Sequence, residues 1–204
     1  MIRLENVDMC QYTSFKAGGS AREMIIVESV EELQTVLKEV QIENKKWLML
    51  GNGSNTLISD KGFDGTVVKL GDSFADIVVA EDGLICGTAA LMSVVAKAAL
   101  RECMTGFEPL SGIPGSLGGA VFMNAGAYDG EMKDIVESVQ LMDCDGNLLE
   151  KTCEEMDFAY RHSIVADENL IVVGATLKLD HGDKEAIAAR MEELAIARRT
   201  KQPL

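Results

Sequence analysis

The chain has 204 residues, of which 47% are hydrophobic and 25% charged, as is typical of a globular protein. Thirty-three acidic residues against nineteen basic ones give a net charge of −14, which opposes a surface that follows nucleic-acid phosphates. No apolar run approaches the roughly 20 residues that span a bilayer, and the N-terminus lacks the pattern of a signal peptide. We therefore expect a cytoplasmic protein that binds neither nucleic acid nor membrane.

The cysteines and histidines argue against a metal centre. The chain has two histidines and five cysteines, and no two cysteines form a C-x-x-C pair. Clustered Cys and His ligands are what a structural zinc site requires. We expect free thiols and no metal at Cys10, Cys86, Cys103, Cys144 and Cys153.

The first third of the chain predicts a β-α-β unit. Residues 21–29 carry the apolar run of a buried strand, and Ser29 and Glu32 have the spacing of a capping box. Residues 47–50 form a second apolar run, which Gly51 ends. The helix expected between the two strands places one apolar face at helical spacing, namely Val30, Leu33, Val36, Leu37 and Val40.

A meander is expected next, with short strands at residues 67–70, 77–80 and 84–86. Thr88 is expected to cap a second helix that ends near Gly106. The expected apolar face of this helix consists of Leu91, Val94, Val95, Ala98 and Leu100.

The last third predicts a hairpin, a strand and a helix. Residues 136–144 and 148–152 flank a turn at Asp145-Gly146, and residues 169–180 read as a further strand. A helix from about Asp183 closes the chain and uses Ile187, Met191 and Leu194 for packing. Its basic end, Arg198, Arg199 and Lys201, is interpreted as a solvated terminus that complements the helix dipole rather than as an anion site.

Two glycine-rich segments are the strongest candidates for ligand binding. Residues 51–56 can direct backbone amides and polar side chains at an anionic oxygen, although a tight loop without ligand explains them equally well. Residues 111–120 combine a rigid proline with glycines and hydroxyls and suit a pyrophosphate. The glycine density of residues 111–130 argues against a regular strand or helix there. In so acidic a chain, we expect binding through backbone dipoles rather than Lys or Arg, as for a large nucleotide cofactor.

Four motifs occur in a recognisable order. They are T-S-F-K-A-G-G at residues 13–19, G-N-G-S-N at 51–55, S-G-I-P-G-S-L-G-G-A-V-F-M-N-A-G-A-Y at 111–128 and Y-R-H-S at 160–163. Together they resemble the UDP-N-acetylenolpyruvoylglucosamine reductases, flavoenzymes of peptidoglycan precursor synthesis. The resemblance covers nearly the whole chain from about residue 7 onward.

The resemblance implies an α+β fold of the vanillyl-alcohol-oxidase (PCMH) type, made of two α+β subdomains at residues 1–72 and 73–204 that enclose non-covalent FAD. In this family a third domain closes over the UDP-sugar. The resemblance places Asn124, Ala125 and Gly126 along the flavin and the strand near Val172 against the isoalloxazine. It assigns the FAD pyrophosphate and ribityl contacts to Gly51, Asn52, Gly53, Ser54, Asn55, Thr56, Ser111, Gly112, Ile113, Pro114, Gly115, Ser116, Gly118 and Gly119.

The resemblance also implies a reaction. NADPH reduces FAD, and the flavin passes hydride to the double bond of UDP-N-acetylglucosamine enolpyruvate to give UDP-N-acetylmuramate. Arg161 matches the family arginine that stabilises the developing enolate, and Tyr160 lies beside it at the substrate. By its residue type alone, Arg161 would be interpreted as a surface or paired structural arginine.

The pattern stops at Lys201-Gln202-Pro203-Leu204. The proton-donating serine of the family follows the K-Q-P stretch, and its second catalytic residue is a glutamate near the C-terminus, so neither has a counterpart here. We expect the third domain to be absent, FAD binding to survive and turnover to be lost or nearly so. The intact family members are expected to be monomers, whereas the face left uncovered here favours self-association.

Other functions are compatible with parts of the sequence. A stand-alone flavin-binding module or electron-transfer subunit would need the glycine loops but not Arg161. The flavin subunit of a multi-subunit hydroxylase is disfavoured by the run at residues 111–128. A domain whose glycine loops bind no ligand is the remaining alternative.

Overall fold

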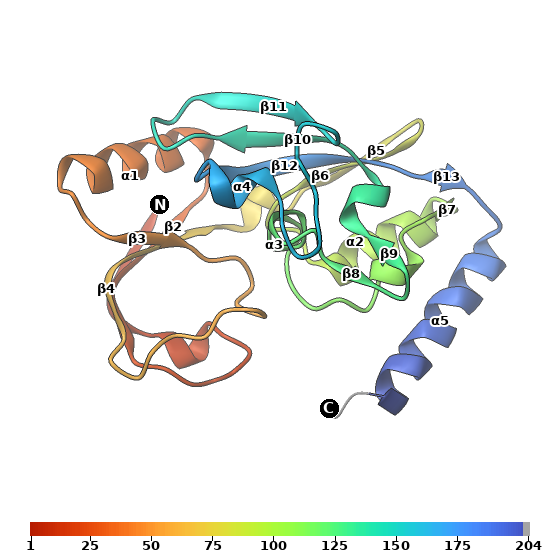
Figure 1. Ribbon diagram of the computed structural model, residues 1–204, viewed down its shortest axis with the longest axis horizontal. Helices are drawn as coiled ribbons and strands as arrows, with labels where there is room; N and C mark the ends of the chain where they lie inside the picture. The colour runs from red at the N-terminus through yellow and green to blue at the C-terminus, as the bar shows by residue number, and fades with distance from the viewer. Residues whose placement is uncertain (202–204) are drawn as a thin grey trace.

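The computed structural model describes residues 1–201 and contains two main sheets with helices packed against them (Figure 1). The first sheet has the order β1-β2-β4-β3, with strands Ile2–Asp8, Ser20–Val27, Phe63–Leu70 and Trp47–Met49. The second is antiparallel and has the order β11-β10-β12-β6-β5, with strands Leu148–Thr152, Val136–Met142, Ile171–Lys178, Gly83–Gly87 and Ile77–Ala80. This mixture of helices and sheets confirms the predicted α+β class. Gln202, Pro203 and Leu204 of the K-Q-P stretch lie outside the described residues.

The first sheet contains the predicted β-α-β elements in an unexpected arrangement. Strands β2 and β3 are not neighbours, because β4 lies between them and pairs with both in parallel. Helix α1, Val30–Ile42, begins as predicted at Ser29, whose side chain accepts a hydrogen bond from the Glu32 amide at 3.2 Å. The reciprocal bond of a capping box is missing, because the Glu32 carboxylate accepts from the Glu28 amide at 2.8 Å instead.

Helix α2, Met92–Arg101, begins later than predicted, and Thr88 does not cap it. Residues 88–92 instead pair with the second glycine-rich segment: the Met92 amide donates to the Gly115 carbonyl and the Leu117 amide to the Ala90 carbonyl. Leu91 directly precedes the helix, and both Leu91 and Val94 are exposed rather than packed. The buried face consists of Met92, Val95, Ala96, Ala98 and Ala99.

The second glycine-rich segment contains a helix, α3, Leu117–Phe122, where none was expected. The Gly118 amide donates to the Thr88 carbonyl at 2.8 Å, and a Cβ at Gly118 would overlap the Thr88 hydroxyl. Glycine is therefore present because the helix packs closely against Thr88, not because the chain is irregular.

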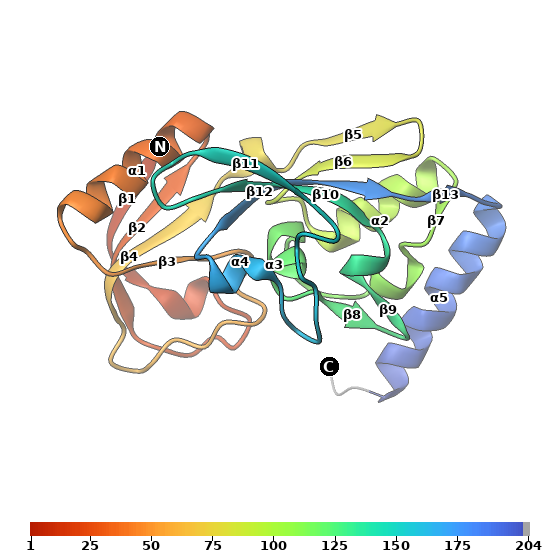
Figure 2. The same cartoon turned by 45° about the horizontal axis from the view of Figure 1, so that its top comes forward.

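The predicted hairpin β10-β11 and the long strand β12 are present, and helix α5, Lys184–Lys201, ends the described chain. Figures 1 and 2 show α5 running along one end of the molecule beyond β13. It contacts α2 and η3. Ile187 and Leu194 are its buried residues, and Met191 packs against the core that contains α2. The remaining short elements are η1 Met9–Gln11, η2 Asp72–Phe74, β7 Met104–Thr105, η3 Glu108–Leu110, β8 Gly126–Ala127, β9 Gly130–Glu131, η4 Met132–Asp134, α4 Ile164–Asp167 and β13 Asp180–His181.

Helix α1 joins the two sheets through a shared apolar core. Its buried residues pack with Val68 of the first sheet and with Met142 and Val173 of the second. A larger core lies under the second sheet and includes α2 and α3, while a third lies on the other face of the first sheet. This packing fixes the ends of β3 and β4 near α3. None of the helices within residues 1–201 combines the length and apolarity needed to cross a membrane.

Candidate functional site

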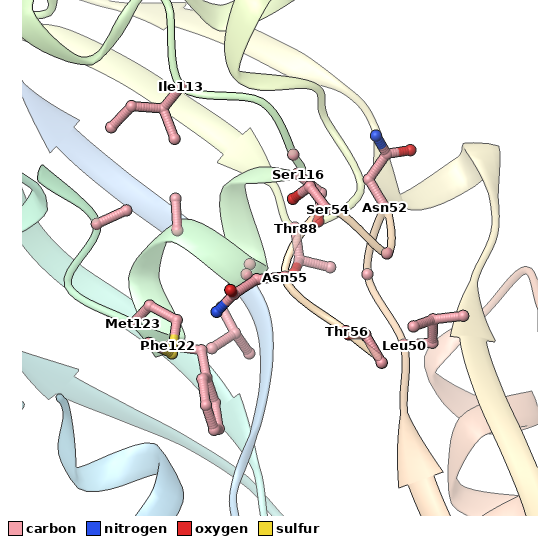
Figure 3. A pocket seen from close by; sticks show the side chains of 18 of the residues that line it. Leu50, Asn52, Ser54, Asn55, Thr56, Thr88, Ile113, Ser116, Phe122 and Met123 are labelled. Atoms are coloured by element: carbon pink, nitrogen blue, oxygen red, sulfur yellow. The ribbon is translucent and has the colours of Figure 1, made fainter. Parts of the chain in front are cut away.

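A cavity of about 580 Å³ lies where the two glycine-rich segments meet (Figure 3). Its size is in the range of roughly 300–1,000 Å³ typical of small-molecule and cofactor sites. The structure brings together on its wall most of the predicted site residues, namely Gly51, Asn52, Gly53, Ser54, Asn55, Thr56, Ile113, Pro114, Gly115, Ser116, Gly118, Gly119, Ala125, Gly126, Arg161 and Val172.

The two glycine-rich loops touch each other at the edge of the cavity. The Ser54 hydroxyl donates to the Pro114 carbonyl at 3.0 Å. A Cβ at Gly51 would lie 2.7 Å from the Ser116 hydroxyl, and one at Gly115 would lie 2.8 Å from the Ser54 hydroxyl. Figure 3 shows Ser54 and Ser116 together at this junction. A side chain at either glycine would have to displace the facing serine hydroxyl, and Gly115 in addition has a φ of +129°, which favours glycine.

Gly53 adds a backbone requirement to the first loop. Its φ is +66°, in the left-handed region, and a Cβ there would overlap the Tyr12 carbonyl. The Ser14 amide in turn donates to the Gly53 carbonyl at 3.0 Å. The segment around residues 12–14, part of the first motif, therefore supports the loop from behind.

Four predicted site residues do not line the cavity. Ser111 donates its hydroxyl to the Glu108 carbonyl at 2.7 Å, Gly112 lies against Arg198, and Tyr160 is 84% exposed. Asn124 is fully buried behind the wall. The geometry of the cavity therefore does not support the prediction that these four residues contact a cofactor or substrate.

Asn124 makes hydrogen bonds within the protein instead of facing a flavin. Its amide nitrogen donates to the Glu131 carboxylate at 2.6 Å and to the Ala159 carbonyl at 3.0 Å, and its oxygen accepts from the Lys133 amide at 3.0 Å. Its backbone has a φ of +40°. The expectation that Asn124 lines the flavin is corrected: it fastens the β8-β9 region to the turn that carries Arg161.

Arg161 lies in that turn and faces the cavity. Ala159 and His162 close the turn with two backbone hydrogen bonds, and Arg161 has a φ of +55°. Its guanidinium donates to the Gly126 carbonyl at 2.9 Å and lies 5.2 Å from the centre of the Tyr160 ring. A guanidinium has five N–H donors, so most remain available for a carboxylate or phosphate in the cavity.

The cavity is positively charged although the chain is acidic. Lys69, Arg161 and Arg198 line it, and no Asp or Glu is among its described lining residues. None of the three cations has a carboxylate within 4 Å in residues 1–201. The wall therefore offers cationic side chains as well as the backbone amides on which the sequence-based expectation relied. In the same residues, no group of His, Cys, Asp or Glu is placed to hold a metal ion.

Lys69 and Arg198 are site residues that sequence reasoning missed. Lys69 interrupts the apolar run of β4, and its ammonium donates to the Gly51 carbonyl at 3.0 Å. Burial lowers the pKa of Lys69. Arg198 lies 5.8 Å from the centre of the Tyr128 ring, whereas the neighbouring Arg199 pairs with Glu192. Its spacing from Met191 and Leu194 continues the apolar stripe of α5, a signal that separates it from Arg199.

Comparisons with known proteins agree with this geometry. A family model described as an FAD binding domain matches residues 21–152. UDP-N-acetylenolpyruvoylglucosamine reductase of Clostridioides difficile (strain 630) is 45% identical over 96% of this chain and 64% of its own length. The corresponding protein of Caldanaerobacter subterraneus is 44% identical over 98% of this chain and 66% of its own. The chain thus spans slightly less than two thirds of these relatives.

The chain is also similar to solved structures of flavoproteins. A crystal structure of UDP-N-acetylenolpyruvylglucosamine reductase from Thermus caldophilus matches all of this chain and 70% of its own, with a TM-score of 0.84 and 35% identity. A VAO-type flavoprotein from Myceliophthora thermophila matches 79% of this chain with a TM-score of 0.60 and 14% identity. The second likeness concerns the fold alone. Together they confirm the predicted vanillyl-alcohol-oxidase type of FAD-binding fold.

Proposed function

The chain belongs to the UDP-N-acetylenolpyruvoylglucosamine reductase family, and on this premise we propose that it holds FAD non-covalently between its two glycine-rich loops for the reduction of UDP-N-acetylglucosamine enolpyruvate. One observation carries the proposal: two facing glycine loops line one cavity with three cations that have no carboxylate partner in the described part of the chain. A negatively charged pyrophosphate would satisfy both.

The residues of the wall fit the other parts of FAD as well. The cavity is also lined by apolar side chains, against which a flat flavin ring could pack. They include Leu50, Phe122, Leu170, Ile171 and Val172. FAD, when bound, supplies the acceptor and donor of hydride, and we propose NADPH as its reductant. We further propose that the protein is cytoplasmic and that residues 1–72 and 73–204 form its two subdomains.

Arg161 is the proposed catalytic residue. Its turn and its bond to Gly126 hold the guanidinium at the cavity before a substrate arrives. Negative charge that develops on the enolpyruvyl side during hydride transfer would be stabilised by this preorganised donor. Removing such a donor typically costs about 100- to 1,000-fold in rate.

We also propose that these 204 residues bind FAD without full turnover, because they contain no counterpart of the proton-donating serine of the family. An absorption spectrum of the purified chain, followed by anaerobic titration with FAD and NADPH, tests both parts. We expect flavin bands, and bleaching by NADPH. A colourless protein that ignores added FAD would refute the cofactor site, and full conversion of the UDP-sugar would refute the loss of turnover.

A variant at Arg161 separates cofactor binding from substrate recognition. We expect Arg161→Met to bind FAD within about threefold of the wild type, because Lys69 and Arg198 remain. The change that the UDP-sugar causes in the flavin spectrum should then require about 10- to 100-fold more ligand, the usual range for losing a charged hydrogen bond. An unchanged titration would remove Arg161 from the substrate site.

A further inference from the structure

Lys69 occupies an unusual place in the first sheet. Strand β4 alternates its side chains, so Val68 and Leu70 pack under α1, whereas Val67 lies in the core of the opposite face. Lys69 shares this face with Val67, at the end of the strand that meets the cavity. A half-buried lysine at the end of a buried strand needs a polar environment, because lysine is rarely buried without a partner.

The protein supplies only part of that environment. The Lys69 ammonium donates to the Gly51 carbonyl at 3.0 Å, and residues 1–201 offer it no other hydrogen-bond partner and no carboxylate within 4 Å. An ammonium has three N–H donors, so two remain. Burial lowers the pKa of Lys69 although the charge of Asp72 acts in the opposite direction, and an anion in the cavity would raise the pKa of Lys69 further.

The three cavity cations lie at different parts of the wall. Arg161 is bonded to Gly126, and Arg198 lies beside Gly112 and Tyr128, both on the side of the second glycine-rich loop. Lys69 is bonded to the first residue of the first loop. It is therefore the cation on the side of Ser54 and Asn55, whose polar groups also line the cavity.

We propose that Lys69 binds a phosphate group of the cofactor from the side of the first glycine-rich loop, so that the preference for FAD over uncharged riboflavin depends on this side chain. The inference rests on the proposed FAD site. While the cavity holds no anion, the same ammonium restrains the loop through Gly51. On binding, its two remaining donors meet the phosphate oxygens as charge-assisted hydrogen bonds.

The test is a set of dissociation constants for FAD and for riboflavin, measured by fluorescence at two KCl concentrations. Lys69→Met should weaken FAD binding by about 10- to 100-fold, change riboflavin binding less than twofold and reduce the salt dependence of FAD binding. Lys69→Arg should restore most of the affinity for FAD, because it returns the charge and donors. The control Lys97→Met makes the same charge change on an exposed part of α2 and should match the wild type.

Three outcomes would overturn the inference. Lys69→Met could bind FAD within twofold of the wild type, in which case the ammonium does not contact the cofactor. FAD and riboflavin could lose equal affinity with no change in salt dependence, and Lys69 would then act only by holding the loop. A wild-type chain that binds no FAD would instead refute the proposed function itself, and this result is recognised before any variant is made.

Discussion

The outer edge of the first sheet and the wall of the cavity use cationic side chains in opposite ways. At the outer edge, Arg3 of β1 bonds to Glu39 of α1 at 2.8 Å and to Glu23 of β2 at 3.2 Å. At the cavity, Lys69 and Arg161 bond only to backbone carbonyls among residues 1–201. Where positive charges already have carboxylate partners they hold the fold together, and where they do not they are available to a ligand.

The two regions also differ in how closely their parts are packed. At the outer edge, β1 pairs with β2 through its backbone, and the link to α1 is made by long, partly exposed side chains. The cavity wall is closely packed at Gly53 and Gly118 and is supported from behind by the buried side chain of Asn124. We therefore expect substitutions in the wall to lower the free energy of unfolding more than substitutions at the outer edge.

The largest effect is expected for Asn124→Ala. It removes three hydrogen bonds of the buried Asn124 side chain, one of them to the Glu131 carboxylate, which should lower the free energy of unfolding by about 4 kcal/mol. The control is Asn147→Ala, because Asn147 is exposed and bonds to Asp143 at 2.9 Å. Urea denaturation measures the free energy of unfolding of both variants. The control should lose less than about 1 kcal/mol. Equal losses would contradict the special role of the buried network.

Two adjacent glycines in α3 give the next effect. Gly118→Ala should lower the free energy of unfolding by about 2–3 kcal/mol, since its methyl group would overlap Thr88. Gly119→Ala places its methyl group 3.7 Å from the Ser116 hydroxyl and gains helix propensity, so it should be neutral or stabilising by up to about 1 kcal/mol. Urea denaturation without added FAD compares the two. A tolerated Gly118→Ala would mean that α3 can move away from Thr88.

The elements that could be predicted are those whose periodicity decides them locally. Helix α1, the hairpin β10-β11 and strand β12 follow from apolar spacing and turn residues. Strand β1 was missed because, as an edge strand, it buries only Val7, and the insertion of β4 between β2 and β3 is a long-range choice. The start of α2 depends on pairing with residues 115–117, which no local pattern contains.

The site residues that could be predicted are those whose sequence motif itself forms the cavity wall. Both glycine-rich loops and Arg161 line the cavity. Asn124, which belongs to the motif at residues 111–128, lies behind the cavity wall. Composition misled in one respect: a net charge of −14 says nothing of where nineteen basic residues lie. Lys69 could be recognised only once β4 was placed at the cavity, whereas the spacing of Arg198 from Met191 and Leu194 was a signal already present in the sequence.

The smallest effect is expected at the outer edge and depends on pH. Arg3→Met should lower the free energy of unfolding by about 0.5–1 kcal/mol at pH 7, because its ion pairs are partly exposed and screened. The hydrogen bond from Arg3 lowers the pKa of Glu39. This stabilisation is therefore present above the pKa of an unfolded glutamate and is lost as the pH falls through the lower folded value. Urea denaturation from pH 7 to pH 3 should show wild type and variant converging below about pH 4. A difference that persists at pH 3, or any change in FAD affinity in Arg3→Met, would contradict the separation between cations that hold the fold and cations that face the ligand.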